Sequence, residues 1–266
     1  MINIVVPIYG SVAANFFQFI LNIDVALKDQ KVAYCLDLEV GDSLITRARN
    51  SLITRYYNKT KTEAPPDYLL WLDSDIHCHP QQLIDMISRA QTYRLDAVGA
   101  LVPIKGFTDN YFREPIPFIF TAEEVPEVFK DDPALLKADN LTTGCLLLST
   151  KAVAALVRDA QKNRQWYHKT DGVSQPERHY DVFKTGIVDT VVQGQKIRKY
   201  LSEDWYICHK MQSLGIQLYA DRSVKIAHRG IYDFSHPTAH EHAVIEDCRD
   251  YLGYLLNRGG EENVSS

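Results

Sequence analysis

Short apolar runs alternate with amphipathic stretches along the first hundred residues of the chain. The apolar runs are rich in β-branched and aromatic residues and predict strands at residues 2–6, 34–40, 68–72 and 97–102. The stretches between them place apolar residues at helical spacing and predict helices at residues 12–27, 43–57 and 81–92. Asp42 or Ser43 would cap the second helix. This alternation predicts an α/β fold with a mostly parallel central sheet flanked by helices.

The pattern is less regular after Pro103. Residues 104–139 predict short strands and loops. The later apolar patterns predict a strand at 142–149, helices at 151–162 and 202–214, a hairpin of 186–192 with 196–200, and short strands at 217–220 and 224–227. We see no repeat and no linker. We therefore expect a single domain over residues 1–256 and a flexible, Gly- and Glu-rich tail at residues 257–266.

The composition narrows the class of protein. The 266 residues are 45% apolar and 24% charged, and the net charge is −5 without any basic block, which argues against a nucleic-acid-binding protein. The five cysteines are scattered and form no C-x-x-C pair, so we expect reduced thiols and a cytoplasmic location. We expect neither a signal peptide nor a transmembrane segment, because the sequence shows neither pattern.

Asp73, Ser74 and Asp75 follow directly after the apolar run at residues 68–72. Ligands of open α/β sheets bind at the carboxyl ends of strands. Two neighbouring carboxylates repel each other there unless a cation lies beside them. Mg²⁺ or Mn²⁺ prefers such oxygen ligands and would bridge to a diphosphate. The alternative is a solvated polar turn, since Asp and Ser are common turn residues.

Two later residues could complete such a site. Asp204 lies at the start of a predicted helix and could take a proton from an acceptor hydroxyl as general base, whereas Glu203 is interpreted as a residue that favours the helix start. His228 follows a short predicted strand and could be a third protein ligand to the ion. His77 and His79 compete for that role, and a lone histidine is also a common structural residue.

Residues near the first strand and in the second helix could hold a nucleotide. Pro7, Tyr9 and Gly10 end the first strand, where they could contact a base and a ribose, or could simply terminate the strand. Arg49 suits a diphosphate because its guanidinium donates several charge-assisted hydrogen bonds, although it could also lie on a solvated helix face. The sequence contains no P-loop, no H-E-x-x-H and no G-x-S-x-G motif.

Taken in order, these segments resemble the family 2-like GT-A glycosyltransferases, and most closely their short bacterial, phage and large-virus members. The resemblance covers most of residues 1–235 and lies in VPIYG at 6–10, ITRARN at 45–50, LWLDSDI at 70–76, AVGA at 97–100, Pro103, TGCLLL at 143–148, LSED at 201–204 and HRG at 228–230. The chain departs from the larger processive synthases, because it has neither their Q-x-x-R-W motif nor their membrane helices.

The resemblance implies a metal-dependent hexosyltransferase with a GT-A fold. It would move a sugar from a UDP- or GDP-sugar donor to a glycan or another hydroxyl acceptor, by inversion, with Mn²⁺ or Mg²⁺ as cofactor. By position, Asp75 and His228 would bind the metal and Asp204 would be the general base. Asp73 would contact the donor and could also reach the metal, beside Ser74 in the same motif.

Other residues are placed less firmly by the resemblance. Lys105 falls where such enzymes contact donor or acceptor, and either Asp37 or Glu39 would read the base. Two rival functions remain on the same fold. One is a hydrolase that uses water as acceptor, and the other is a sugar-nucleotide-binding protein without catalysis.

Overall fold

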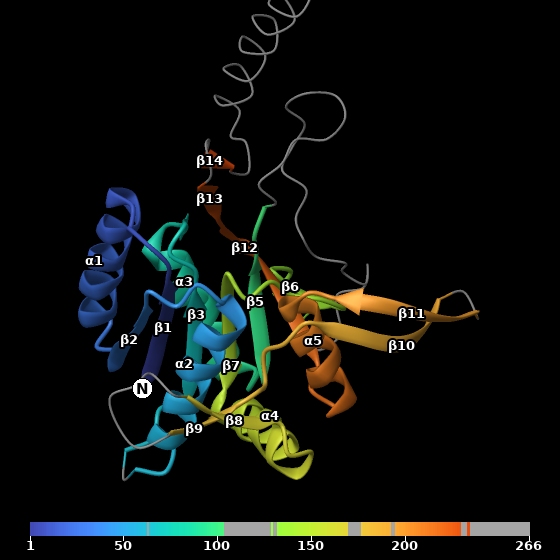
Figure 1. Cartoon of the computed structure of the whole chain (residues 1–266). Coiled ribbons are helices and arrows are strands. Elements are labelled where there is room, and N and C mark those ends of the chain that lie inside the picture. The colour runs from blue at the N-terminus through green and yellow to red at the C-terminus, as the bar shows by residue number, and fades with distance from the viewer. Residues whose placement is uncertain are drawn as a thin grey trace, which may run out of the picture.

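The computed structural model describes residues 1–62, 64–103, 129, 132–169, 177–192, 195–229 and 233–234. Their central sheet has seven strands in the order β2-β1-β3-β7-β5-β12-β6 (Figure 1). Five strands run in one direction: β1 (Ile2–Ile8), β2 (Tyr34–Val40), β3 (Tyr68–Leu72), β5 (Ala97–Leu101) and β12 (Leu218–Lys225). The expected α/β fold with a mostly parallel central sheet is confirmed. Lys105 and the tail at 257–266 lie outside the described residues.

In the described part of the chain, five helices cover the two faces of the sheet. On one face α1 (Ala14–Asp29) packs against α3 (Pro80–Thr92). The other face is covered by α2 (Ile45–Lys59), α4 (Thr150–Lys162) and α5 (Glu203–Ser213). Each layer has its own apolar core, which is why the described part of the chain forms a three-layer sandwich.

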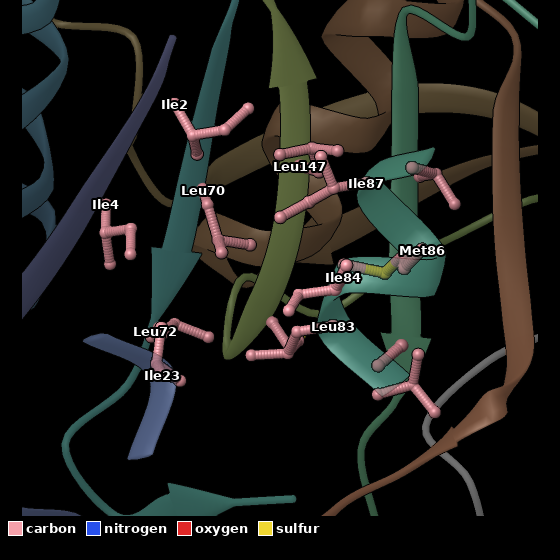
Figure 2. Packing of buried hydrophobic residues seen from close by; sticks show 14 of the residues in the cluster. Ile2, Ile4, Ile23, Leu70, Leu72, Leu83, Ile84, Met86, Ile87 and Leu147 are labelled. Atoms are coloured by element: carbon pink, nitrogen blue, oxygen red, sulfur yellow. The ribbon is translucent and has the colours of Figure 1, made fainter. Parts of the chain in front are cut away.

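Alternate residues of the inner strands point into opposite layers. Ile4 of β1 and Leu70 of β3 belong to the same apolar cluster as Leu83 of α3, and all three are labelled in Figure 2. Val5 and Trp71 face the layer of α2, α4 and α5. Because both faces are covered, every position of β1 and β3 is buried, which explains why neither strand shows polar alternation.

Strand β7 (Cys145–Ser149) is inserted antiparallel between β3 and β5, and this was not foreseen from the sequence. It corresponds to the second part of the strand predicted at residues 142–149. The β5–β7 contact requires a glycine at Gly99. A Cβ atom there would lie 3.1 Å from the carbonyl oxygen of Cys145, closer than a side chain normally approaches backbone.

Most other elements agree with the predicted ones to within a few residues. The hairpin of β10 (Gly186–Val192) and β11 (Gln195–Leu201) is confirmed. A second hairpin, β8 (Trp166–Lys169) with β9 (Glu177–Tyr180), was missed because its sequence is polar. The two short strands predicted at 217–227 are one strand, β12, with a register shift between Asp221 and Lys225.

The remaining strands lie either at one end of the central sheet or outside it. β6 (Leu135–Ala138) pairs with β12 and ends the sheet. β13 (Ala227–Arg229) pairs with both β4 (Ile76–His77) and β14 (Asp233–Phe234) in a small separate sheet.

The cap predicted for the second helix was wrong. The residue before α2 is Leu44, and no side chain caps the helix. Asp42 accepts a hydrogen bond from the Leu44 amide at 3.0 Å and pairs with Arg47, so it closes the preceding turn instead. No described helix combines the length and the apolar character that crossing a membrane requires.

Candidate active site

A cavity of about 400 Å³ opens at the carboxyl ends of β1 and β3. β1 pairs with β2 on one side and with β3 on the other, so the chain changes direction across the sheet at β1. The cavity therefore lies at a topological switch point of the sheet. Its lining comes from four segments and consists of Pro7, Ile8, Tyr9, Asp42, Ser43, Ile45, Ala48, Arg49, Asp73, Ser74, Asp75, Glu203 and Asp204. Segments that are distant in the sequence therefore meet in one site.

Most of the residues that the sequence singled out lie in this cavity. They are Pro7, Tyr9, Arg49, Asp73, Ser74, Asp75 and Asp204. Gly10 is not part of the lining; its φ of +80° turns the chain just after Tyr9, whose ring is 71% exposed. The lining also includes Asp42, Ser43 and Glu203, which the sequence did not assign to the site.

Arg49 is the centre of the site. One of its terminal nitrogens donates to Glu203 Oε1 and Asp204 Oδ1, both at 2.9 Å, and the other donates to both oxygens of Asp73 at 3.2 Å. Its side chain is only 3% exposed. Burial alone would lower the pKa of Arg49, but the three carboxylates outweigh burial and raise it, so the guanidinium stays charged.

The fold places Arg49 through its neighbours on α2. Asn50 accepts hydrogen bonds from the amides of Val182 and Phe183 at 3.0 and 2.7 Å, which fixes the segment before β10 against the helix. The Phe183 ring then packs edge-on against Trp71 and lies 5.9 Å below the Arg49 guanidinium. The Arg49 guanidinium therefore lies between the apolar ring of Phe183 and the three carboxylates.

Asp204 is held by Arg49 and by the segment before β7. Thr143 donates to Asp204 Oδ1 from its hydroxyl, and from its amide at 3.4 Å. Burial raises the pKa of Asp204, while the Arg49 guanidinium and the Thr143 hydroxyl act in the opposite direction. The next residue, Gly144, accepts a hydrogen bond from the Asp73 amide at 2.9 Å. The T-G pair of the sequence thus supports both acids.

His228 lies beside Asp75. Antiparallel pairing of β13 with β4 sets His228 opposite Ile76, and the amide of Arg229 donates to the Asp75 carbonyl at 2.7 Å. The His228 Nε2 atom is 3.5 Å from Asp75 Oδ1. Its Nδ1 atom is 2.7 Å from the carbonyl oxygen of Pro103, which can only accept, so Nδ1 carries a proton.

This tautomer suits a metal ligand. Metal-binding histidines usually donate their second N–H to a carbonyl or carboxylate, which directs the free lone pair at the ion. With the proton on Nδ1, both Nε2 of His228 and Oδ1 of Asp75 are acceptor atoms, and the two could bind the same cation. The rival histidines are engaged elsewhere: His79 accepts from the Gln81 amide at the start of α3, and His77 lies 3.5 Å from the Asn15 amide nitrogen.

The described residues contain no ready group of three or more His, Cys, Asp or Glu side chains that could hold a metal ion. Both carboxylate oxygens of Asp73 accept hydrogen bonds from Arg49. Of the expected trio of Asp73, Asp75 and His228, the described residues show a direct contact only between Asp75 and His228, while Asp73 pairs with Arg49.

The two acids of β2 have different surroundings. Asp37 binds Asn3 and Lys59 next to the core. Glu39, two residues nearer the cavity, binds Arg55 at 2.6 Å and Lys169 at 2.5 Å. Glu39 also lines a second cavity, of about 430 Å³, which shares Asp42 with the first. Of the two candidates for reading the base, Glu39 is therefore the better placed.

The chain resembles several solved structures in fold, at low sequence identity. The solved structures it matches include A197 from STIV (13% identity, 86% of this chain and 85% of that one, TM-score 0.47). They also include GalNAc-T7 with UDP, GalNAc and Mn²⁺ (9%, 85% and 43%, 0.48) and S. aureus TarS (14%, 93% and 38%, 0.39). The chain spans less than half the length of the last two. No family model and no curated protein matches. Since the TM-scores of these three structures are below 0.5, the activity has to be inferred from the residues of this chain.

Proposed function

We propose that this chain is a metal-dependent, inverting glycosyltransferase of the GT-A type. It would move a hexosyl group from a UDP- or GDP-sugar to a hydroxyl of a glycan or another acceptor. The observation that supports this most directly is the hydrogen bonding of buried Arg49 to Asp73, Glu203 and Asp204 at the switch point of the sheet. Through these bonds Arg49 links Asp73, which is expected to contact the donor, to Asp204, which is expected to act as the base.

The charge of the cavity supports a divalent cation. Five carboxylates line it, from Asp42, Asp73, Asp75, Glu203 and Asp204, and among the lining residues only Arg49 is cationic. A diphosphate would be repelled from such a cavity without further positive charge. Asp75 and His228 would hold Mn²⁺ or Mg²⁺, with the remaining positions left to phosphate oxygens and water. When bound, the ion would stabilise the negative charge of the departing diphosphate.

The chain's own residues would perform the proton transfer. In the described part of the chain, the hydrogen bonds to Asp204 all end on Oδ1, so Oδ2 is the atom that would accept the proton. The acceptor oxygen forms its bond to the anomeric carbon as the bond to the nucleoside diphosphate breaks, and its proton passes to Asp204. Burial favours this transfer, because a carboxylate with a raised pKa is a stronger base.

Arg49 would have a supporting role in this scheme. Its four hydrogen bonds keep three carboxylates within one cavity despite their mutual repulsion. It could also offset charge on the donor diphosphate, as the sequence suggested. Pro7, Tyr9 and Ser74 line the cavity where a nucleotide would lie, and Lys105, Gly10 and Glu39 are further candidates for donor contacts.

Replacement of Asp204 by Asn tests the proposal. Transfer of labelled sugar from UDP- and GDP-sugars, screened with Mn²⁺ and a panel of glycan acceptors, should fall by about 10²–10⁴-fold. Donor binding measured by calorimetry should persist. Asp85→Asn, on α3 outside the cavity, is the control and should retain full transfer. Unchanged transfer in Asp204→Asn would contradict the role of the base. Equal turnover with and without acceptor would indicate a hydrolase, and donor binding without turnover would indicate a binding protein.

A further inference from the structure

The β10–β11 hairpin has one face that packs on the protein and one that does not. In its register, Gly186 opposes Leu201 and Val188 opposes Lys199 on the inner face. Leu201 is buried, and Lys199 lies over the ring of Trp205 at 4.2 Å. Figure 1 shows both strands extending past α5, away from the central sheet.

The outer face of this hairpin combines apolar and basic side chains. Ile187 opposes Tyr200 and Asp189 opposes Arg198, with Lys196 next along β11 on the same face. Tyr200 is 67% exposed and Ile187 is 56% exposed, so this pair of side chains forms an exposed apolar patch. The Arg198 side chain is 76% exposed, and its pairing with Asp189 at 3.8 Å is too loose and solvated to neutralise it.

Along the chain the hairpin is joined directly to the residues of the candidate active site. Tyr200 is four residues before Asp204, and α5 begins at Glu203 immediately after the hairpin. Alternate residues of a strand are about 7 Å apart, so Tyr200, Arg198 and Lys196 form a row along β11 in which Tyr200 is the member nearest to Asp204 in sequence. An acceptor that presents its hydroxyl to Asp204 and continues along β11 would meet an aromatic ring first and two cations next.

We infer that the acceptor is an acidic glycan, with a sugar ring on Tyr200 and carboxylate or phosphate groups at Arg198 and Lys196. This inference rests on the proposed function for the identity of the acceptor site. An exposed tyrosine offers a sugar ring an amphipathic surface, and the two cations complement an anion. The basic row stands out because the chain as a whole has a net charge of −5 and the active-site cavity is strongly acidic.

Binding of labelled dextrans to the full chain tests this inference by fluorescence anisotropy. The probes are unmodified dextran, carboxymethyl dextran and dextran phosphate of equal length, which distinguish the two kinds of anion, and a single-stranded DNA of similar charge. At least one anionic dextran should bind more tightly than unmodified dextran. Its binding should weaken as salt rises from ~0.01 to ~0.15 M, because the Debye length falls from ~30 to ~8 Å.

The paired variant K196E/R198E should weaken binding of that anionic dextran by about tenfold or more. Tyr200→Ala should weaken it as well while retaining the salt dependence. K151E/K162E makes the same change of net charge on α4 and should leave binding unchanged. The inference is overturned if K196E/R198E binds like K151E/K162E, if unmodified dextran binds equally well, or if DNA binds more tightly than both anionic dextrans.

A separate measurement distinguishes this failure from failure of the proposed function. The thermal stabilisation of K196E/R198E by UDP with Mn²⁺ should equal that of the unaltered chain. Loss of dextran binding with intact stabilisation by UDP confines the effect to the hairpin. If neither UDP nor GDP stabilises either protein in the presence of Mn²⁺, the donor site is wrong, and the dextran result still decides whether the hairpin binds acidic glycans.

Discussion

The Nε2 atom of His228 faces the Oδ1 atom of Asp75 at 3.5 Å, with the proton of the ring on Nδ1 and directed at Pro103. This pair connects β13 to the turn after β3, and it is the most specific indication of a metal site in the described part of the chain. A divalent ion that binds here would bind only the folded protein, so it would raise the apparent stability.

Removal of either member of this pair should abolish stabilisation by the metal. In a thermal melt with Mn²⁺ alone, Asp75→Asn and His228→Ala should lose the rise in midpoint that the unaltered chain shows. His79→Ala is the matched control. It removes the side chain that caps α3 and should cost about 0.5–2 kcal/mol, but the rise with Mn²⁺ should remain. A full rise in Asp75→Asn would place the ion elsewhere.

Replacement of Arg49 by Met should destabilise the protein by about 3–5 kcal/mol, because three partly buried carboxylates would lose their shared counter-charge. Urea unfolding at neutral pH measures the change. Arg47→Met, two residues earlier on the same helix, removes an ion pair in which the arginine is half-exposed and Asp42 is buried, and it should cost less, about 1 kcal/mol. Equal losses in the two variants would show that Arg49 is not the centre of the acidic cluster.

Replacement of Thr143 by Val should shift the pH dependence of transfer. The Thr143 hydroxyl lowers the pKa of Asp204 against the effect of burial, so its loss should raise that pKa further. The base must be ionised, and activity therefore falls as the pH drops through its pKa. The acidic limb of kcat/KM should move to higher pH in this variant.

Thr142→Val is the control for this shift. Thr142 is also buried, but within the described residues its hydroxyl has no hydrogen-bond partner. Its acidic limb should match that of the unaltered chain. A shift of similar size in both variants would point to a general loosening of the loop before β7 and not to a direct effect on Asp204.

Replacement of Asp37 by Asn should reduce stability near neutral pH by roughly 1 kcal/mol and leave nucleotide binding unchanged. Burial opposes the charge of Asp37, but Lys59, Asn3 and Arg55 outweigh it and lower its pKa from the usual value of an aspartate. A lowered folded pKa stabilises the protein above the unfolded pKa, and this gain is lost as the pH falls through the folded pKa. The difference between variant and unaltered chain should therefore vanish in acid.

Urea unfolding at several pH values, with UDP titrations at pH 7, checks this prediction. Glu39→Gln is the informative counterpart, because Glu39 lines the cavity next to the site and is the favoured residue for reading the base. It should weaken nucleotide binding. A weaker affinity in Asp37→Asn alone would reverse the assignment of the two acids.

The sequence by itself determined the local elements and several members of the site. Uninterrupted apolar residues at 68–72 indicated a buried strand, and the acids after it were correctly expected at a cavity, because strand ends of parallel sheets are where ligands bind. Helical spacing likewise located α2 and α5, and with them Arg49 and Asp204. These features depend on neighbours within a few residues, which the sequence displays directly.

Only the tertiary structure decided which of these residues meet. The antiparallel insertion of β7 brings Thr143 to Asp204, and the pairing of β4 with β13 brings His228 to Asp75. Glu203, interpreted from sequence as a helix-start residue, turned out to share Arg49 with Asp204. Sheet order and long-range pairing depend on how whole surfaces pack, and local periodicity contains no record of them. The sequence alone therefore did not distinguish Arg49 from the other arginines, whereas the structure shows it buried beside three carboxylates.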